Sequence, residues 1–320
     1  MNWRCKLCLH EQQSEPFLVR EMMFGFRDTF EYLQCAKCEC LQISEVPADI
    51  QKYYPQNYYS FNEASGNKYT GLRGWFRKNA VKATLSKSLL GDFYNFFIPA
   101  KQYFLFKSIP INRDTKILDV GCGNGYKFLF PLAEVGFKNL LGCDPYLNEP
   151  IQYQNGLSIV KSDIFQIEEK WDIITLHHSF EHIANPIETI KKISQLLSDK
   201  GVCIIRIPTV SSFAWEKYKT NWVQLDAPRH FYLHSVKSMN LLASMADLNL
   251  TDIEYDSWNL QFVGSERYLR DIPLRSKQKL SFVEKIKRKI DKLKYDRLSA
   301  QLNREKRGDQ AAFFFRKKVN

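Results

Sequence analysis

Residues 116–126 read KILDVGCGNGY, a short apolar run that leads into a turn with glycine at every second position. The run at 117–120 predicts a buried β-strand, and Asp119 lies near its carboxyl end. Glycines in the turn allow a sharp reversal and a close approach of the backbone to a ligand, and a helix that begins after the turn offers free N–H groups. The stretch therefore predicts a binding site for a nucleotide-sized ligand, built on Gly121, Gly123 and Gly125.

The spacing of these glycines separates two kinds of nucleotide site. A dinucleotide fingerprint, G-x-G-x-x-G, needs its third glycine where this chain has Tyr126. The pattern that begins at Asp119 is instead D-x-G-x-G-x-G. That pattern resembles motif I of the class I S-adenosylmethionine-dependent methyltransferases. The resemblance implies that S-adenosylmethionine is the cofactor.

From residue 116 onward strand and helix patterns alternate, which predicts an α/β fold with a mostly parallel sheet and helices on both faces. Strands are expected near 116–120, 139–143, 157–161, 171–176 and 202–207. Helices are expected near 125–135, 147–154, 186–198 and 235–247. Two more strand patterns, at 250–257 and 311–316, flank a helical insertion. The methyltransferase resemblance implies a Rossmann-like sheet that ends in an antiparallel pair.

Carboxylates follow the first three predicted strands, at the edge where open α/β sheets bind ligands. Asp119 ends the first strand. Asp144 ends the second, 19 residues after Gly125, in a position suited to accept both ribose hydroxyl protons. Asp163 follows the third strand and resembles the family's carboxylate on the adenine side. The predicted cofactor-binding residues are Asp119, Gly121, Cys122, Gly123, Gly125, Asp144, Pro145, Asp163, Ile164 and His177.

Two C-x-x-C pairs near the amino terminus, separated by 26 residues, predict a metal site. Four thiolates about 2.3 Å from one Zn²⁺ leave no open coordination position, so a structural zinc ribbon is expected. Cys40 lies close enough to replace Cys38 as a ligand. Unligated thiols or disulfides are the alternative, and disulfides are disfavoured in the cytosol. The predicted ligands are Cys5, Cys8, Cys35 and Cys38.

The segment after the fourth predicted strand is rich in histidine. Residues 175–186 read TLHHSFEHIANP and hold three of the chain's six histidines. In the resembled family an E-H pair at this place commonly has a packing or capping role. Glu181 and His182 match that pair. We therefore expect His177 or His178 to line the pocket that faces the sulfonium of the cofactor.

The loop at 208–234 combines aromatic side chains with polar ones, a mixture that suits a carbohydrate. Packing by buried aromatics is the alternative. His230, with a reference pKa of about 6.5, is predicted to take the acceptor's proton, with His178 as the second choice. Tyr58 and Tyr59 are expected to orient the substrate. The predicted substrate-binding residues are Trp215, Trp222, Asp226 and Arg229.

Four features together narrow the resemblance: the cysteine-ligated segment, YYPQNYYSF at 53–61, motif I, and WVQLDAPRH at 222–230. They resemble bacterial methyltransferases of surface-polysaccharide and deoxysugar pathways, over roughly residues 1–260 and 308–318. The similarity includes sugar C-methyltransferases with an N-terminal zinc-binding domain. Those enzymes carry a second Rossmann-like domain for which this chain has no room. The resemblance therefore implies methylation of a sugar oxygen, or less readily a sugar carbon, on a nucleotide-linked or lipid-linked glycan.

The net charge of +11 is concentrated outside the predicted catalytic domain. Residues 275–320 contain 16 basic and 5 acidic side chains, whereas residues 1–60 are net acidic, so nucleic acid is not the expected partner of the ribbon. A basic helix at 276–306 carries an apolar stripe. The helix is expected either to contact an anionic membrane or acidic partner, or to pack its stripe against the core. The stripe consists of Val283, Ile286, Ile290 and Leu293.

The expected organisation has four parts, and the expected location is the cytoplasm. No apolar run of about 18 residues and no signal peptide is present, so the helix would at most touch the inner face of a membrane. The parts are a zinc ribbon and aromatic linker at 1–60, a helical cover at 61–110, a methyltransferase domain at 111–274 and 308–320, and a basic amphipathic insertion at 275–307.

Two alternatives to a sugar methyltransferase belong to different functional classes. An RNA methyltransferase would use the ribbon and the basic tail as a clamp, and it predicts salt-sensitive RNA binding. A non-catalytic scaffold would bind the cofactor structurally and recruit partners through the C-terminal helix. Methyl transfer to an acceptor would exclude the scaffold.

Overall fold

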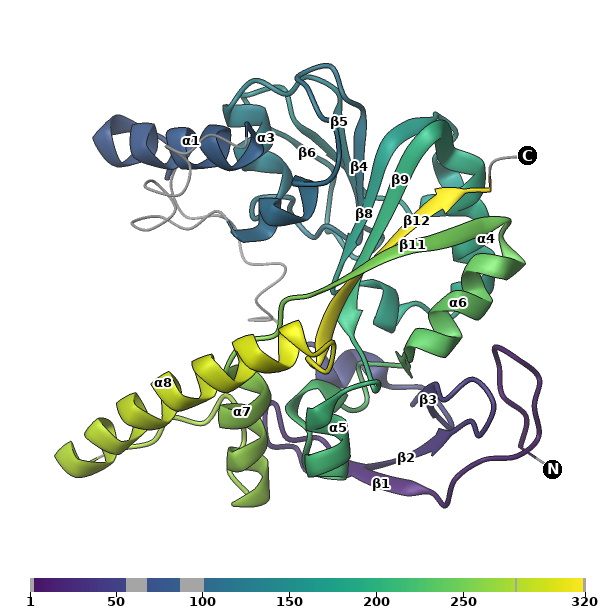
Figure 1. Cartoon of the computed structure of the whole chain (residues 1–320), viewed down its shortest axis with the longest axis vertical. Coiled ribbons are helices and arrows are strands. Elements are labelled where there is room, and N and C mark those ends of the chain that lie inside the picture. Colours follow the sequence, from purple (N-terminus) through teal and green to yellow (C-terminus); the bar gives the residue numbers. More distant parts are fainter. Residues whose placement is uncertain (1–2, 56–67, 87–100, 280, 319–320) are drawn as a thin grey trace.

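The computed structural model describes residues 3–55, 68–86, 101–279 and 281–318 (Figure 1). The predicted orienting residues Tyr58 and Tyr59 lie outside the described residues. The largest element is an eight-stranded sheet in the order β11-β12-β9-β8-β4-β5-β7-β6. Its strands are β4 Ile117–Val120, β5 Leu140–Cys143, β6 Ile151–Gln152, β7 Ser158–Val160, β8 Trp171–His177, β9 Leu197–Pro208, β11 Leu248–Tyr255 and β12 Gln310–Lys317.

Helices cover both faces of this sheet (Figure 1). Leu118 packs in the cluster formed with α4 and α6, and Ile117 packs in the cluster formed with α1 and α3. Successive strand side chains point to opposite faces, which explains this division. Within the described residues the α-helices are α1 Gly71–Leu85, α3 Leu129–Glu134, α4 Pro186–Leu196, α5 Phe213–Tyr218, α6 Val236–Met245, α7 Leu260–Leu269 and α8 Phe282–Arg304. The 3-10 helices are η1 Ile50–Tyr53, η2 Lys101–Phe106, η3 Ile164–Gln166, η4 Phe180–His182, η5 Lys219–Asn221 and η6 Val223–Leu225.

The strand pairing confirms the predicted fold class. β4 is parallel to β5 and to β8, β5 is parallel to β7, and β8 is parallel to β9. β12 lies between β9 and β11 and is antiparallel to both. The result is a Rossmann-like, mostly parallel sheet that an antiparallel pair closes.

The helix predicted at 147–154 is wrong. These residues form turns and the short strand β6, which is antiparallel to β7 with Ile151 opposite Ile159. Pro150 lies in the middle of the predicted helix. Proline has no N–H to donate, and its ring clashes with the preceding helical turn, so the chain adopts an extended conformation there.

A second, smaller sheet joins the amino-terminal segment to the loop at 208–234. β1 Phe17–Arg20, β2 Thr29–Gln34 and β3 Leu41–Ile43 are antiparallel, and β10 Tyr232–Leu233 pairs with β3. The hydroxyl of buried Tyr32 donates a 2.8 Å hydrogen bond to the carbonyl oxygen of His230. The amino-terminal segment therefore supports the end of the loop that carries His230.

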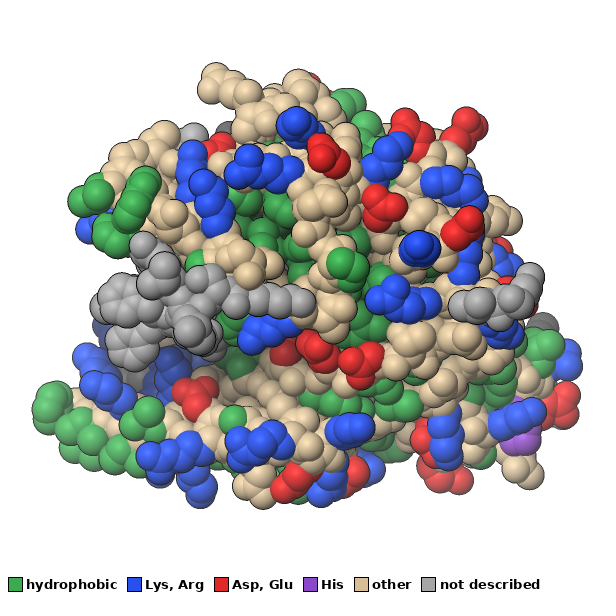
Figure 2. Space-filling model, turned by 45° about the horizontal axis from the view of Figure 1, so that its top comes forward, with side chains coloured by type: hydrophobic (Ala, Val, Ile, Leu, Met, Phe, Trp, Pro, Cys, Tyr) green, Lys and Arg blue, Asp and Glu red, His purple; other side chains and the backbone are tan. Residues whose placement is uncertain are grey.

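Helix α8 projects from the body of the molecule (Figure 1). Only Ser299 and Leu302 of its 23 residues are buried. The predicted apolar stripe is exposed, because Val283 is 73% and Leu293 is 59% accessible, so the alternative in which it packs against the core is wrong. Figure 2 shows apolar and basic side chains together at the lower left edge, where α8 projects. Among the described residues, no helix is both long and apolar enough to span a membrane.

Candidate active site

Glycine is required at two positions of the turn after β4. Gly121 has φ +69° and Gly125 has φ +67°, a region that residues with a Cβ rarely adopt. A Cβ on Gly121 would lie 2.4 Å from the Cβ of Ser179, and one on Gly125 would lie 2.5 Å from Cδ1 of Ile159. The turn is thus held tightly against β7 and the segment that follows β8.

Asp119 is buried at the end of β4. Thr175 of β8 donates a 2.8 Å hydrogen bond from Oγ1 to Oδ1 of Asp119. Burial raises the pKa of the Asp119 carboxyl to about 7, although the hydrogen bond from Thr175 opposes that shift. Both the neutral and the charged form of the group are therefore populated near neutral pH.

Asp144, directly after β5, fixes the same turn. Its Oδ2 accepts a 2.8 Å hydrogen bond from the N–H of Gly123, and its Oδ1 accepts a 2.9 Å bond from the N–H of Tyr146. Each carboxylate oxygen has two lone pairs, so both oxygens keep acceptor capacity for hydroxyl groups. This geometry is compatible with the ribose-binding role, which stays a prediction.

The remaining predicted cofactor residues lie along the same edge of the sheet. Asp163 is exposed and caps η3, because its Oδ1 accepts a 2.9 Å hydrogen bond from the N–H of Phe165. The ring of His177 lies 4.3 Å from that of Phe128, and burial holds the pKa of His177 well below its usual value. Its imidazole is therefore neutral at pH 7. Neighbouring strands β4, β5 and β7 thus lead into the three predicted carboxylates, Asp119, Asp144 and Asp163.

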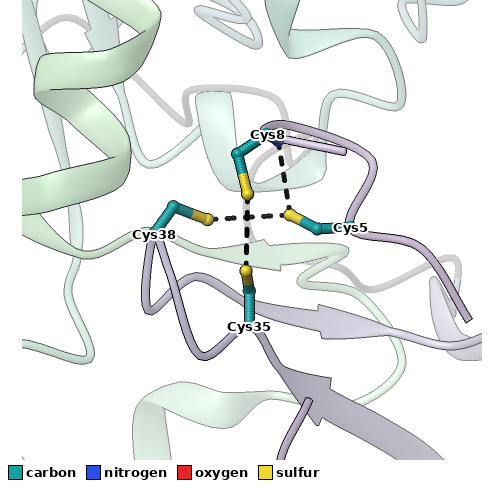
Figure 3. A group of neighbouring side chains, drawn as sticks. All are labelled: Cys5, Cys8, Cys35 and Cys38. Carbon is teal, nitrogen blue, oxygen red and sulfur yellow. Dashed lines mark hydrogen bonds between the residues drawn. The ribbon is translucent and has the colours of Figure 1, made fainter. Parts of the chain in front are cut away.

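The four predicted zinc ligands converge on one point (Figure 3). Their Sγ atoms all lie within 4.8 Å of one another. The Sγ atoms of Cys5 and Cys38 are 3.6 Å apart, and those of Cys8 and Cys35 are 3.4 Å apart. Sulfurs about 2.3 Å from one tetrahedral ion would be about 3.8 Å apart, so the four thiols fit such an ion.

The two C-x-x-C turns have the same backbone geometry. The N–H of Leu9 donates to the carbonyl oxygen of Cys5 at 3.0 Å, and the N–H of Glu39 donates to that of Cys35 at 2.9 Å. Leu9 and Glu39 both have φ +59°. Two matching turns place the two pairs of sulfurs face to face, as a four-thiolate metal site requires.

Cys40, predicted as an alternative ligand, lies outside the four-cysteine group. It is fully buried, and its Sγ is 4.0 Å from Nδ1 of His234. Cys38 occupies the fourth position of the group instead. The placement of Cys40 therefore does not support it as a replacement for Cys38 among the metal ligands.

A second group of potential metal ligands lies after β8. Glu181, His182 and His230 each place one ligand atom within 4.8 Å of the other two. Burial opposes ionisation of Glu181, but the nearby imidazoles of His178 and His230 lower the pKa of its carboxyl to about 2. The carboxylate is thus charged at pH 7. Sequence spacing does not reveal this group, because His230 lies far from the E-H pair along the chain.

The two predicted proton acceptors, His230 and His178, differ in their hydrogen bonds. Nε2 of His178 lies 2.7 Å from Nη1 of Arg206, so it accepts a hydrogen bond from the guanidinium. Nδ1 of His230 lies 2.8 Å from the carbonyl oxygen of Gln224 and must carry the proton. Nε2 of His230 therefore has a lone pair, and it faces Oε1 of Glu181 at 3.9 Å.

Arg229 and Asp226 form a buried ion pair instead of an open binding surface. Arg229 is fully buried, and its Nη2 lies 2.6 Å from Oδ1 of Asp226 and 2.8 Å from Oε1 of Glu21. Its Nη1 donates a 2.9 Å hydrogen bond to the carbonyl oxygen of Tyr53. These contacts occupy the guanidinium, and the role of the pair as a substrate contact stays a prediction.

The tryptophans of the loop are also part of the core. Trp222 is fully buried, and its Nε1 donates a 3.0 Å hydrogen bond to Oδ2 of Asp309. Trp215 is buried against Phe17 of β1, with ring centroids 5.0 Å apart. The predicted stacking of Trp215 and Trp222 on a sugar does not fit this burial. Their aromatic surface instead joins the amino-terminal sheet to the loop.

The fold and the glycine turn define a class I methyltransferase: an open α/β sheet, closed by an antiparallel pair, with a nucleotide-sized site after β4, β5 and β7. Residues 92–253 match the family described as "Methyltransferase domain". The match covers just over half of the chain, and the chain belongs to this family. The predicted enzyme class, an S-adenosylmethionine-dependent methyltransferase, is confirmed.

The curated relatives that match the chain are named as tRNA-modifying enzymes. The tRNA U34 carboxymethyltransferase of Campylobacter hominis is 29% identical over 110 residues, which cover 31% of this chain and 38% of the relative. The enzyme of the same name from Campylobacter fetus is 24% identical over 192 residues, which cover 57% of this chain and 66% of the relative. The chain thus spans between about a third and two thirds of these relatives' length.

These relatives overturn two predictions. The predicted glycan substrate, methylated on oxygen or carbon, is wrong, because the relatives are named for a tRNA nucleoside. The prediction that nucleic acid is not a partner is also wrong. That prediction used the acidic residues 1–60, whereas the basic side chains lie on other elements, notably α8.

Solved structures with a similar fold include the cyclopropane synthase MmaA2 of Mycobacterium tuberculosis. It is 15% identical in sequence, and the match covers 68% of this chain and 83% of the synthase chain, with a TM-score of 0.43. A SAM-dependent methyltransferase from Archaeoglobus fulgidus is 16% identical in sequence. The match covers 72% of this chain and 100% of that methyltransferase chain, with a TM-score of 0.42.

Proposed function

We propose that this protein transfers a methyl group from S-adenosylmethionine to an RNA, and that tRNA is its substrate class. The observation that carries the proposal is the similarity to tRNA U34 carboxymethyltransferases in a chain of the methyltransferase domain family. The reaction is a displacement at the sulfonium, so the main contribution of the protein is to hold the acceptor in line with the methyl group.

The donor would bind along the edge formed by the ends of β4, β5 and β7. In this proposal Asp144 accepts the ribose hydroxyl protons, and Asp163 binds on the adenine side. The glycine turn at 121–125 lets the backbone approach the cofactor closely. Asp119 supports the turn from the end of β4.

Helix α1 offers a surface suited to unpaired nucleotides. It contains no acidic residue, and Arg73 and Lys82 are exposed on it. Trp75 is 52% accessible, and its ring packs edge-on against that of Phe76 with centroids 5.0 Å apart. Exposed aromatic rings stack on bases, while neighbouring cations bind the phosphates. Lys68, just before this helix, donates its backbone N–H to the hydroxyl of Tyr126 at 3.2 Å, so the surface adjoins the glycine turn.

Helix α8 offers a second basic surface. It contains eight Lys or Arg residues and three acidic residues, and all eight basic residues are exposed. Both α1 and α8 extend from the same side of the molecule (Figure 1). Basic side chains on such surfaces bind phosphates and release counterions, which supplies affinity for RNA of any sequence.

We further propose that the four-cysteine group holds a structural Zn²⁺. Four thiolates leave no open coordination position, so the ion would stabilise the fold and take no part in methyl transfer. Gln42 donates a 2.9 Å hydrogen bond from Nε2 to Sγ of Cys5, as expected for a sulfur that carries negative charge.

The test is methyl transfer to RNA by the full chain. The protein is incubated with S-adenosylmethionine labelled in its methyl group and with total bacterial tRNA, ribosomal RNA or a protein mixture. We expect label in the tRNA fraction. Digestion to nucleosides and mass spectrometry would then identify the methylated nucleoside.

Asp144→Ala is the matched control, because it removes the carboxylate expected to bind the ribose. This variant should lose both S-adenosylmethionine binding, measured by calorimetry, and methyl transfer. If the wild-type chain binds S-adenosylmethionine but labels neither RNA fraction, the RNA substrate is excluded and the donor site is retained.

A further inference from the structure

The group formed by Glu181, His182 and His230 is distinct from the four-cysteine group and contains none of the predicted donor residues. We propose that it is a second metal site and that it binds a divalent cation of the zinc type. This inference does not depend on the identity of the methyl acceptor. It rests on three features of the group: a buried carboxylate without a hydrogen-bond donor, the hydrogen bonds behind both imidazoles, and the separation of the ligand atoms.

The carboxylate of Glu181 is buried without a hydrogen-bond donor. Its side chain is fully inaccessible, and neither Oε atom has a hydrogen-bond partner among the described residues. The nearest nitrogen atoms of basic side chains are Nδ1 of His178 at 3.6 Å and Nε2 of His230 at 3.9 Å. A buried carboxylate is strongly destabilising unless a cation and hydrogen bonds compensate it. The site therefore requires a positive charge close to these oxygens.

Both histidines are oriented as metal ligands are. Nδ1 of His182 lies 2.8 Å from the carbonyl oxygen of Arg229, and Nδ1 of His230 lies 2.8 Å from that of Gln224. A carbonyl oxygen only accepts, so each Nδ1 carries the ring proton and each Nε2 keeps its lone pair. Histidines that bind metals typically donate their other N–H to a backbone carbonyl in this way.

The separation of the atoms favours a metal ion over a shared proton. A proton between Nε2 of His230 and Oε1 of Glu181 would hold them about 2.7–2.9 Å apart. The observed distance is 3.9 Å. Two ligand atoms about 2.1 Å from one ion lie about 3.0–4.2 Å apart, depending on the angle at the ion. The gap is therefore too wide for a hydrogen bond and fits a coordinated ion.

The ligand types indicate which ion binds and what it does. Two imidazoles and one carboxylate are typical of zinc sites that keep an open coordination position, in contrast to the closed thiolate set. The open position would accept an oxygen atom, from water or from the acceptor. In this assignment Nε2 of His230 binds the ion and has no lone pair for a proton. The assignment therefore replaces the predicted role of His230 as the proton acceptor.

The test counts ions and identifies their ligands in the full chain. Protein is produced with cobalt(II) in place of zinc, and bound metal per chain is measured by elemental mass spectrometry. Cobalt bound to thiolates gives a charge-transfer absorption that cobalt bound to nitrogen and oxygen lacks. We expect two ions per chain, of which only one contributes to the thiolate absorption.

Glu181→Gln and His230→Gln should each leave one ion per chain, with the thiolate absorption unchanged. That unchanged absorption, together with the circular dichroism spectrum, shows that each variant has folded. His178→Gln is the matched control, because it removes an imidazole beside Glu181 that lies outside the group, and it should keep two ions. One ion per wild-type chain, or equal loss in the His178 variant, would overturn the assignment.

Discussion

Gly121 combines a positive φ with a neighbour in direct contact. Its φ is +69°, and an added Cβ would lie 2.4 Å from the Cβ of Ser179. We expect Gly121→Ala to destabilise the fold by about 1–3 kcal/mol and to weaken S-adenosylmethionine binding by at least about tenfold, since the turn must move. Urea unfolding and calorimetric titration measure the two effects.

The control for that substitution is Gly156→Ala. Gly156 has φ +88°, but an added Cβ would meet no atom within 4 Å. The control shares the backbone strain without the clash, and it should keep cofactor affinity. Equal loss of affinity in both variants would show that strain alone, and not the contact of the turn with Ser179, controls the site.

Asp119 predicts a pH dependence of stability. Its folded pKa is raised from 3.8 to about 7, so the folded state binds the proton more tightly than the unfolded state. The stabilisation is complete below the unfolded pKa and is lost as pH rises through about 7. Over that window each pH unit costs at most about 1.4 kcal/mol. Urea unfolding should show a smaller decline for Asp119→Asn than for the wild type between pH 5 and 8.

Some functional residues were predictable one at a time, and others were not. The glycine turn and the C-x-x-C pairs depend on spacing within a few residues. The glycines adopt the positive φ that a tight turn needs, and the four cysteines lie together. The ion pair of Arg229 with Glu21 was not predictable, because the two residues lie 208 positions apart in the sequence. A polar side chain beside aromatics has the same local pattern in a sugar site and in a buried ion pair. Sequence spacing alone does not separate the two.

At the scale of elements, the four-cysteine group supports a sheet that reaches beyond its own segment. β3 follows the second C-x-x-C turn and pairs with β10. We expect Cys35→Ser to release the metal and to lower stability by at least about 2 kcal/mol. Hydrogen exchange should become faster in β10 as well as in β3. Cys40→Ser, outside the group, should keep its metal content.

Helix α8 predicts a salt-dependent contribution to RNA binding. Lys285→Glu combined with Lys289→Glu should lower RNA affinity by at least about tenfold at low salt. It should also reduce the slope of log K against log salt, since each phosphate contact contributes about 0.7–0.9 to it. Fluorescence anisotropy with labelled tRNA measures both quantities. Lys191→Glu combined with Lys200→Glu, on and after α4, is the charge-matched control and should change neither.

Most elements of the catalytic sheet were predictable, because their apolar periodicity is strong and their ends carry clear turn residues. The helix predicted at 147–154 does not form, because Pro150 has no N–H to donate and its ring clashes with the preceding helical turn. The stripe on α8 was located correctly, but its environment was not. A helical stripe shows that one face is apolar, and it does not show what covers that face.

At the scale of the whole molecule, the candidate RNA-binding helices come from opposite ends of the chain. α1 precedes the catalytic sheet, and α8 lies between its last two strands, β11 and β12. The two extend from the same side of the molecule (Figure 1). An RNA large enough to contact both should therefore bind with a steeper salt dependence than a short RNA that reaches only one.

The arrangement also predicts how substitutions in the two helices combine. Arg73→Glu in α1 and the Lys285/Lys289 double substitution in α8 share no contacts, so their free-energy costs for tRNA binding should add within about 0.5 kcal/mol. For a short single-stranded oligonucleotide, which stacks on Trp75, only the α1 substitution should matter. Anisotropy titrations of both RNAs with the three variants provide the comparison. An oligonucleotide equally sensitive to both changes would show that the helices form one continuous site.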